Sequence, residues 1–179
     1  MQEELGYIEG GSETLVHALV AEIERLGGRV LLGTPIQEIV VIDGAVTGVR
    51  IGAEIQHFDR VISTVPTPYV SGLIPALPDE LRARYDAIPN VGVVCVMTRL
   101  RKSVTPHFWV NISDTRFEIP GIIEFSNLRP LPDTVVYVPY YMPQTHPKFA
   151  KDDAYFVNEV LSYLKLLNPS IVQGDVVAT

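Results

Sequence analysis

The side chains that could carry acid–base or nucleophilic chemistry are few in this sequence and widely separated. No two histidines have helical metal-binding spacing, so the sequence predicts no metal site. Ser12 and Ser63 do not stand in a G-x-S-x-G motif, which makes both poor candidates for a nucleophile. Glu118 and Glu124 lie near expected strands and could act as an acid or a base in a cleft, although solvated carboxylates are far commoner. Residue types alone therefore identify no catalytic residue.

The single cysteine and the aromatic residues are the other chemically distinctive side chains. Cys95 lies in the apolar run VGVVCVM, which favours a buried, inert thiol over a nucleophile. One cysteine excludes an internal disulfide framework and a multi-cysteine metal site, and it fits a reducing, cytoplasmic compartment. Trp109, Tyr137 and Tyr140 could form the wall of a substrate pocket, and ordinary sheet packing explains them at least as well.

The composition limits the classes of partner. The chain has 179 residues, of which 47% are hydrophobic and 20% charged, enough for a substantial core. Its net charge of −7 argues against nucleic acid, because phosphate binding requires clustered Lys and Arg. No apolar run reaches the ~18 residues of a membrane span, and the first residues lack the basic and apolar regions of a signal peptide. The composition thus favours neither a nucleic-acid partner nor a membrane span, and it gives no oligomeric state.

A helix and a hairpin organise the first part of the chain. Apolar residues recur at helical spacing from Leu15 to Leu26, and Gly27-Gly28 ends the helix. Asp43-Gly44 predicts a two-residue hairpin turn. Pro66 and Pro68 prevent strand pairing beyond residue 63. The expected strands are residues 29–32, 35–42, 45–51, 54–58 and 61–63.

A β-rich segment with helices makes up the rest of the chain. Pro78 opens a helix that runs to Ile88, after a short helix at 69–73. Asp152 or Asp153 caps a helix that Asn168-Pro169 ends. The expected strands are residues 91–100, 108–112, 121–125 and 134–141, with one more in the last ten residues. This order predicts an α+β or α/β fold in two parts, residues 1–75 and 76–179.

Four blocks in a fixed order carry a resemblance to one family. They are GYIEGGSETLVHALVAEIERLGG, RVLLGTPIQEI, the G-x-V-x-G-V hairpin that begins at Gly44, and FDRVISTVP. This order resembles the middle of the superfamily of flavin-dependent amine oxidases, phytoene desaturases and protoporphyrinogen oxidases. The resemblance covers Gly6 to about Pro66, and LPDELRARYDAIP then resembles the family's entry to its substrate domain.

The resemblance implies a fold and a cofactor. Residues 1–75 would form a partial FAD-binding segment of helix, strand and β-hairpin. This segment would join a substrate domain, residues 76–179, with a mixed sheet and flanking helices. Ile36 stands where the family pairs a backbone N–H and C=O with the FAD adenine. Ser63, Thr64 and Pro66 match the segment that passes close to the dinucleotide.

The sequence departs from the family's pattern in two places. The G-x-G-x-x-G unit and the C-terminal flavin segment are absent, so we expect an internal fragment that binds FAD weakly or not at all and is inactive alone. The family's amine oxidases carry a lysine on the strand expected at 91–100, where GVVCVMT has none. The second departure favours a desaturase-like or protoporphyrinogen oxidase-like relationship.

The resemblance implies that the full-length parent oxidises a small-molecule substrate, either an apolar organic compound or an amine, by hydride transfer to FAD. One alternative is a flavin-dependent sugar-nucleotide mutase or isomerase, for which Arg99, Arg101 and Arg129 are the obvious source of positive charge. Another is a non-enzymatic binding domain of flavoprotein ancestry. The sequence names neither the substrate nor the electron acceptor.

Overall fold

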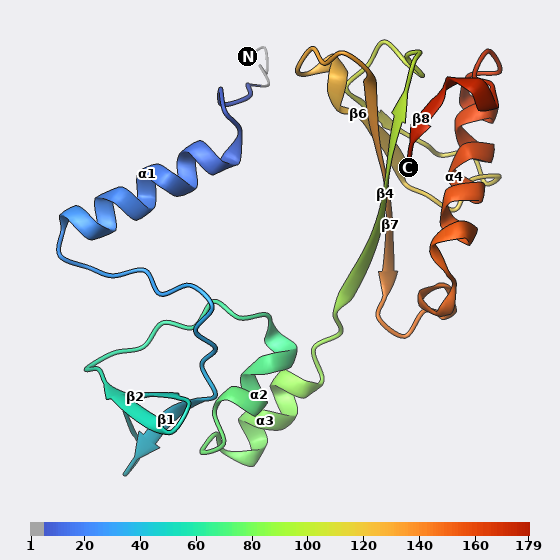
Figure 1. Ribbon diagram of the computed structural model, residues 1–179. Helices are drawn as coiled ribbons and strands as arrows, with labels where there is room; N and C mark the ends of the chain where they lie inside the picture. The colour runs from blue at the N-terminus through green and yellow to red at the C-terminus, as the bar shows by residue number, and fades with distance from the viewer. Residues whose placement is uncertain (1–5) are drawn as a thin grey trace, which may run out of the picture. The chain divides into compact units, whose positions relative to one another are not determined.

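The computed structural model describes residues 6–179 and divides them into two compact units. The three-stranded unit is Leu15–Asn90, and the five-stranded unit joins residues 6–14 to Val91–Thr179. Figure 1 shows their sheets and helices. Helices and two antiparallel sheets confirm the α+β class. The functional division at residue 75 stays a prediction.

Helix α1 (Ser12–Arg25) begins after two glycines and ends as the glycine pair predicts. Gly27 has a φ of +83°, a left-handed conformation that glycine adopts without a steric penalty. None of the helix residues is buried, so its apolar side chains are exposed. The exposed apolar positions are Leu15, Val16, Leu19 and Ile23.

The hairpin of the three-stranded unit forms where Asp43-Gly44 predicts it. Strands β1 (Glu38–Ile42), β2 (Ala45–Ile51) and β3 (Glu54–His57) pair antiparallel in the order β1-β2-β3. Asp43 and Gly44 both have positive φ, 48° and 77°, as a type I′ turn requires. At Gly48 the strands approach so closely that a Cβ would lie 2.1 Å from the carbonyl oxygen of Gln56.

Short helices complete the three-stranded unit. They are η1 (Thr67–Tyr69), α2 (Val70–Leu73) and α3 (Asp79–Asp86), the last beginning after Pro78 as expected. Arg82 of α3 ties the segment together, because its guanidinium donates to the carbonyl oxygens of Ser71, at 2.9 Å, and Pro75, at 2.8 Å.

Two expected strands of this unit do not form. Residues 29–32 and 61–63 belong to no strand, and Leu32 and Ile62 are 87% and 90% exposed. A strand requires a partner to satisfy its backbone groups. Within residues 6–179, neither segment has a strand beside it to pair with. The prediction of strands at residues 29–32 and 61–63 is therefore wrong.

The sheet of the five-stranded unit is antiparallel throughout. Its strands are β4 (Val91–Leu100), β5 (Trp109–Asn111), β6 (Gly121–Glu124), β7 (Thr134–Pro143) and β8 (Val176–Ala178), in the order β5-β6-β7-β4-β8. The ten-residue strands β4 and β7 pair along their whole length, Val91 opposite Pro143 and Leu100 opposite Thr134. The prediction of a mixed sheet is therefore wrong, because each described pairing of adjacent strands is antiparallel.

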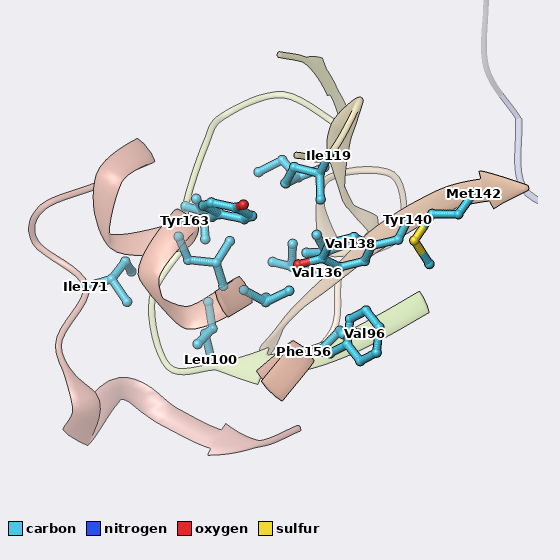
Figure 2. Close-up of a cluster of buried hydrophobic side chains, with 14 residues drawn as sticks. Val96, Leu100, Ile119, Val136, Val138, Tyr140, Met142, Phe156, Tyr163 and Ile171 are labelled. Carbon is cyan, nitrogen blue, oxygen red and sulfur yellow. The ribbon is translucent and has the colours of Figure 1, made fainter. Parts of the chain in front are cut away.

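Helix α4 (Asp153–Leu167) packs its apolar side on one face of this sheet. Asp152 caps it by accepting from the backbone N–H of Tyr155 at 2.9 Å, and Asn168 ends it. Short helices η2 (Phe125–Asn127), η3 (Pro147–Ala150) and η4 (Gln173–Asp175) link the elements. Figure 2 shows the core, in which Val136 and Val138 of β7 face helix residues such as Phe156 and Tyr163.

Side chains along each strand point alternately to the face that α4 covers and to an open face. Along β4, Val96, Thr98 and Leu100 are buried, whereas Cys95 and Met97 are exposed. The expectation of a buried Cys95 is therefore wrong. Both faces of β4 carry apolar side chains, so the sequence alone does not indicate which face packs against the helix.

Replacing the buried Thr98 by valine is expected to stabilise the chain. Thr98 is 1% exposed, and its hydroxyl makes no hydrogen bond within the described residues. Valine has nearly the same shape and leaves no unpaired polar group, so the free energy of unfolding should rise by about 1 kcal/mol. Denaturant unfolding measures the change. Thr115→Val, at an exposed turn, should leave the midpoint unchanged, and a lower midpoint for Thr98→Val would contradict the argument.

Candidate functional site

A groove in the three-stranded unit brings together three of the predicted cofactor-binding residues. Its volume is about 270 Å³, and Ile36, Ser63 and Thr64 all line it. Its other lining residues are apolar: Ile39, Val49, Val61, Ile62, Val65 and Leu73. Two segments far apart in sequence thus form the walls of one concave surface.

The backbone of three lining residues takes no part in the strand ladders of this unit. The ladder of β1 begins after Ile36, since Gln37 donates to the carbonyl oxygen of Arg50 at 3.0 Å. Among the described residues, no hydrogen bond uses the backbone of Ile36, Ser63 or Thr64. Three residues that line the groove therefore have backbone groups that are unpaired within the described residues.

Pro66, the fourth predicted cofactor-binding residue, lies next to the groove in sequence but is not among its lining residues. It has a φ of −57°, and its carbonyl oxygen accepts from the N–H of Tyr69 at 3.0 Å. Pro66 therefore fixes the exit of the extended segment into η1. Its role is one of shape, and direct contact with a ligand stays a prediction.

The groove has the chemistry of a binding surface. Its lining combines aliphatic side chains with the hydroxyls of Ser63 and Thr64, and none of its described lining residues is ionisable. Aliphatic walls and free backbone edges suit a flat heteroaromatic ring, whose faces are apolar and whose rim carries donors and acceptors. Proton transfer, by contrast, needs a titratable group within hydrogen-bonding distance.

The open face of the five-stranded sheet carries a row of apolar and aromatic side chains. Trp109 lies opposite Ile123, Ile123 opposite Tyr137, and Tyr137 opposite Met97, so the four share one face. Met97 is 58% and Trp109 49% exposed. We call these four residues the apolar row. It is a broad exposed surface of the kind that binds apolar partners.

Tyr140, predicted to share a pocket with Trp109 and Tyr137, lies on the opposite face. It is 1% exposed and packs edge-to-face on Phe156, with ring centroids 5.2 Å apart. Successive residues of a strand face opposite sides, so Tyr137 and Tyr140, three apart, point away from each other. The structure therefore places Trp109 and Tyr137 on one face of the sheet, two strands apart. Tyr140 lies in the core (Figure 2).

The two carboxylates considered as acid or base have structural partners. Glu124 is 1% exposed, and its Oε2 accepts from the backbone N–H groups of Val104, at 3.0 Å, and Thr105, at 2.8 Å. Glu118 forms an ion pair with Lys148 at 2.7 Å. Glu124 is therefore a buried structural group, and Glu118 is held at the surface by an ion pair.

Other reactive groups give no centre either. Partial shielding of its sulfur from solvent raises the pKa of the Cys95 thiol, which keeps it protonated and disfavours nucleophilic attack. No cluster of three or more potential metal ligands occurs in the part of the chain that the structure describes. None of the described helices has the length and hydrophobicity needed to span a bilayer.

The arginines named for a sugar-nucleotide site have separate partners. Arg99 forms an ion pair with Asp133 at 3.3 Å. The Arg129 guanidinium lies over the ring of Tyr7, 5.2 Å from its centroid. No described contact joins these arginines into one pyrophosphate-binding cluster, so no observation favours that alternative.

Sequence reasoning missed several residues of the open face. Met97 and Ile123 complete the apolar row, and the ring of Phe125 stacks edge-on with Tyr137 at 5.8 Å. Tyr7 then packs on Phe125 at 5.4 Å. No sequence signal identifies Met97 and Ile123, because their role depends on strand register. Phe125 and Tyr7 could have been noted as aromatic residues near glycines and strand ends.

Comparisons with known proteins identify relatives. The family model described as flavin containing amine oxidoreductase matches residues 1–178. No curated protein gives a significant match.

Solved structures with a similar fold include two bacterial or archaeal proteins. An oxidoreductase from Methanosarcina mazei is 22% identical, with a TM-score of 0.72 over 94% of this chain. A protein from Exiguobacterium sp. 255-15, provisionally described as a protoporphyrinogen oxidase, is 18% identical, with a TM-score of 0.71 over 89% of this chain. This chain spans only 41% and 36% of their respective lengths. The likeness establishes a shared fold.

Proposed function

The chain belongs to the flavin-containing amine oxidoreductase family, and from this premise we propose that it supplies a cofactor wall and a substrate wall to an FAD-dependent oxidoreductase. The cofactor wall is the groove of the three-stranded unit. The substrate wall is the apolar row of the five-stranded unit. FAD, when bound, supplies the acceptor for a hydride removed from the substrate.

The observation that carries the cofactor assignment is the groove itself. Ile36, Ser63 and Thr64 were identified from two separate sequence blocks, and they line one cavity of about 270 Å³. The N–H and C=O of Ile36 are free to pair with the rim of an adenine ring, and its side chain can cover a ring face. The small side chains of Ser63 and Thr64 permit close approach of a dinucleotide. These residues therefore fit the adenine side of FAD.

The apolar row supports an apolar organic substrate over an amine. None of Met97, Trp109, Ile123 and Tyr137 carries a charge at neutral pH, and together they present a broad apolar surface. Such a surface orients a substrate by shape, which suits removal of a hydride from a carbon that needs no side-chain base. None of the four side chains offers a carboxylate that could pair with the ammonium group of an amine.

Filling the groove tests the cofactor assignment. Thr64→Trp should lower the flavin retained by the full-length protein by about tenfold or more, because the indole occupies the space of the ring. Thr115→Trp, at an exposed turn of the five-stranded unit, is the matched control and should retain flavin. Visible flavin absorbance after gel filtration measures the ratio. Equal flavin content in the two variants, both folded by circular dichroism, would refute the assignment. We expect residues 1–179 alone to lose the flavin during the same chromatography.

A further inference from the structure

Beside the apolar row, three aromatic rings stack in succession and end at a cation. We call these rings, which belong to Tyr137, Phe125 and Tyr7, the aromatic ramp. Tyr137 of the row stacks edge-on with Phe125, at an interplanar angle of 81°, and Phe125 stacks edge-on with Tyr7, at 74°. Arg129 lies over the ring of Tyr7. The three rings thus connect the open sheet face to the guanidinium of Arg129.

The local backbone fixes this end of the ramp. Phe125 opens the short helix η2 directly after β6, and Arg129 donates its backbone N–H to the carbonyl oxygen of Phe125 at 3.0 Å. The two side chains therefore belong to one tight turn. Tyr7, from the segment before α1, packs between them.

Within the described residues 6–179, Arg129 has no ion pair with a carboxylate, unlike two other arginines of this unit. Arg99 is paired with Asp133, and Arg116 with Asp114 at 2.7 Å. Arg129 is exposed, and in the described residues 6–179 its recorded interaction is with an aromatic face. A guanidinium stacked on a ring keeps its N–H donors, which lie in the guanidinium plane, available for an oxyanion.

We propose that this surface selects an organic acid, with its apolar body on the row and its carboxylate paired with Arg129. The inference rests on the proposed function, in which the row is the substrate wall. Apolar contact supplies affinity along Met97, Ile123 and Tyr137, and the bidentate guanidinium fixes which end of the ligand faces η2. Charge complementarity at this end is the basis for choosing an acid over a neutral hydrocarbon.

Trp109 makes a direct test possible, because it is the only tryptophan of the chain and lies in the row. The probes are 4-nitrobenzoate and its neutral counterpart 4-nitrobenzamide, both of which quench indole fluorescence on contact. The protein should bind the carboxylate about tenfold more tightly than the amide, since a charge-assisted bidentate pair replaces a neutral contact. Arg129→Gln should abolish this preference and leave the amide affinity unchanged.

Three further variants separate recognition from folding. Arg116→Gln, which removes a charge at an exposed turn of the same unit, should leave the preference intact. Tyr7→Phe, which keeps the ring under Arg129, should also leave it intact, and Tyr7→Ala should weaken it. Equal affinity for both probes in the unmodified protein, or a preference that survives Arg129→Gln, would overturn the proposal. The readout needs no bound flavin, so failure of the Thr64→Trp experiment would leave this result interpretable.

Discussion

Lys148→Ala is expected to lower the free energy of unfolding by about 3 kcal/mol or more, the largest single effect that we predict for the chain. Lys148 is 8% exposed and forms ion pairs with Glu159, at 2.8 Å, and Glu118, at 2.7 Å. Its ammonium also lies 5.0 Å from the ring centroid of Tyr140. Removing it leaves the half-buried Glu159 carboxylate without its cation, which costs more than the lost attraction.

Lys151→Ala is the matched control for this prediction. Lys151 is exposed and contacts the ring of Tyr155 at 5.3 Å, so its loss should cost less than about 1 kcal/mol. Urea unfolding followed by circular dichroism compares the two. The double variant Lys148→Met with Glu159→Leu should recover most of the loss, because it removes both charges. Equal midpoints for the two single variants would contradict the assignment.

The same ion pair predicts a pH dependence. Burial by itself raises the pKa of Glu159, but the hydrogen bonds and charge of Lys148, together with the tyrosine hydroxyls beside the carboxylate, lower it by more, so the folded-state pKa lies below the unfolded value. The stabilisation is therefore complete above the unfolded pKa, about 4.3 for a glutamate, and is lost as the pH falls through the folded pKa.

In Lys148→Ala the pH effect should reverse. Only neutral tyrosine hydroxyls such as that of Tyr155 then offset the burial of Glu159, so its pKa should rise and protonation relieves the isolated charge. The difference in stability between Lys148→Ala and the unmodified chain should therefore shrink as the pH is lowered towards 4. A difference that is constant with pH would show that the loss comes from packing alone.

Glu124→Ala is expected to cost about 3 kcal/mol, the second largest effect. Its carboxylate accepts two backbone hydrogen bonds from the loop after β4, and Val104 is buried. Alanine leaves both N–H groups without an acceptor, and charge-assisted hydrogen bonds are the stronger class. Thermal unfolding measures the loss.

Glu124→Gln provides a graded comparison, because one amide oxygen can still accept both hydrogen bonds, and it should recover about half of the loss. Glu118→Ala is the control carboxylate, since its side chain is 65% exposed and should matter little. Because Ile123 and Phe125 flank Glu124, the anchored loop also holds the apolar row and the aromatic ramp in place. A loss for Glu124→Ala no larger than that for Glu118→Ala would refute this anchoring role.

Local features of the fold could be predicted because they depend on local chemistry. Strands β2 and β4 have the predicted bounds, α3 begins after Pro78, and Asp152 caps α4. Turn residues, caps and prolines act within a few residues of themselves, so their effects are visible in the sequence. The family could be predicted because an ordered set of such features is more specific than any one of them.

The candidate site was predictable only in part. Ile36, Ser63 and Thr64 were identified by resemblance, and they line one groove. Whether they bind FAD is for the flavin-retention experiment to decide. Trp109 and Tyr137 share a face, whereas Tyr140 lies behind the sheet. Residue type alone does not show whether an aromatic side chain of a strand points to the face that a helix far along the chain covers.

The sequence by itself determined the family, most element positions and the block that forms the groove proposed to bind the cofactor. Tertiary structure alone decided which side of β4 and β7 is core, because helix α4 covers one face of strands that are apolar on both. It also decided that residues 29–32 and 61–63 stay unpaired, since a strand exists only beside a partner. Strand pairing and the packing of a helix on a sheet both depend on residues that are far apart in the sequence. They decide whether a given apolar residue lies in the core, in a groove or on an open surface.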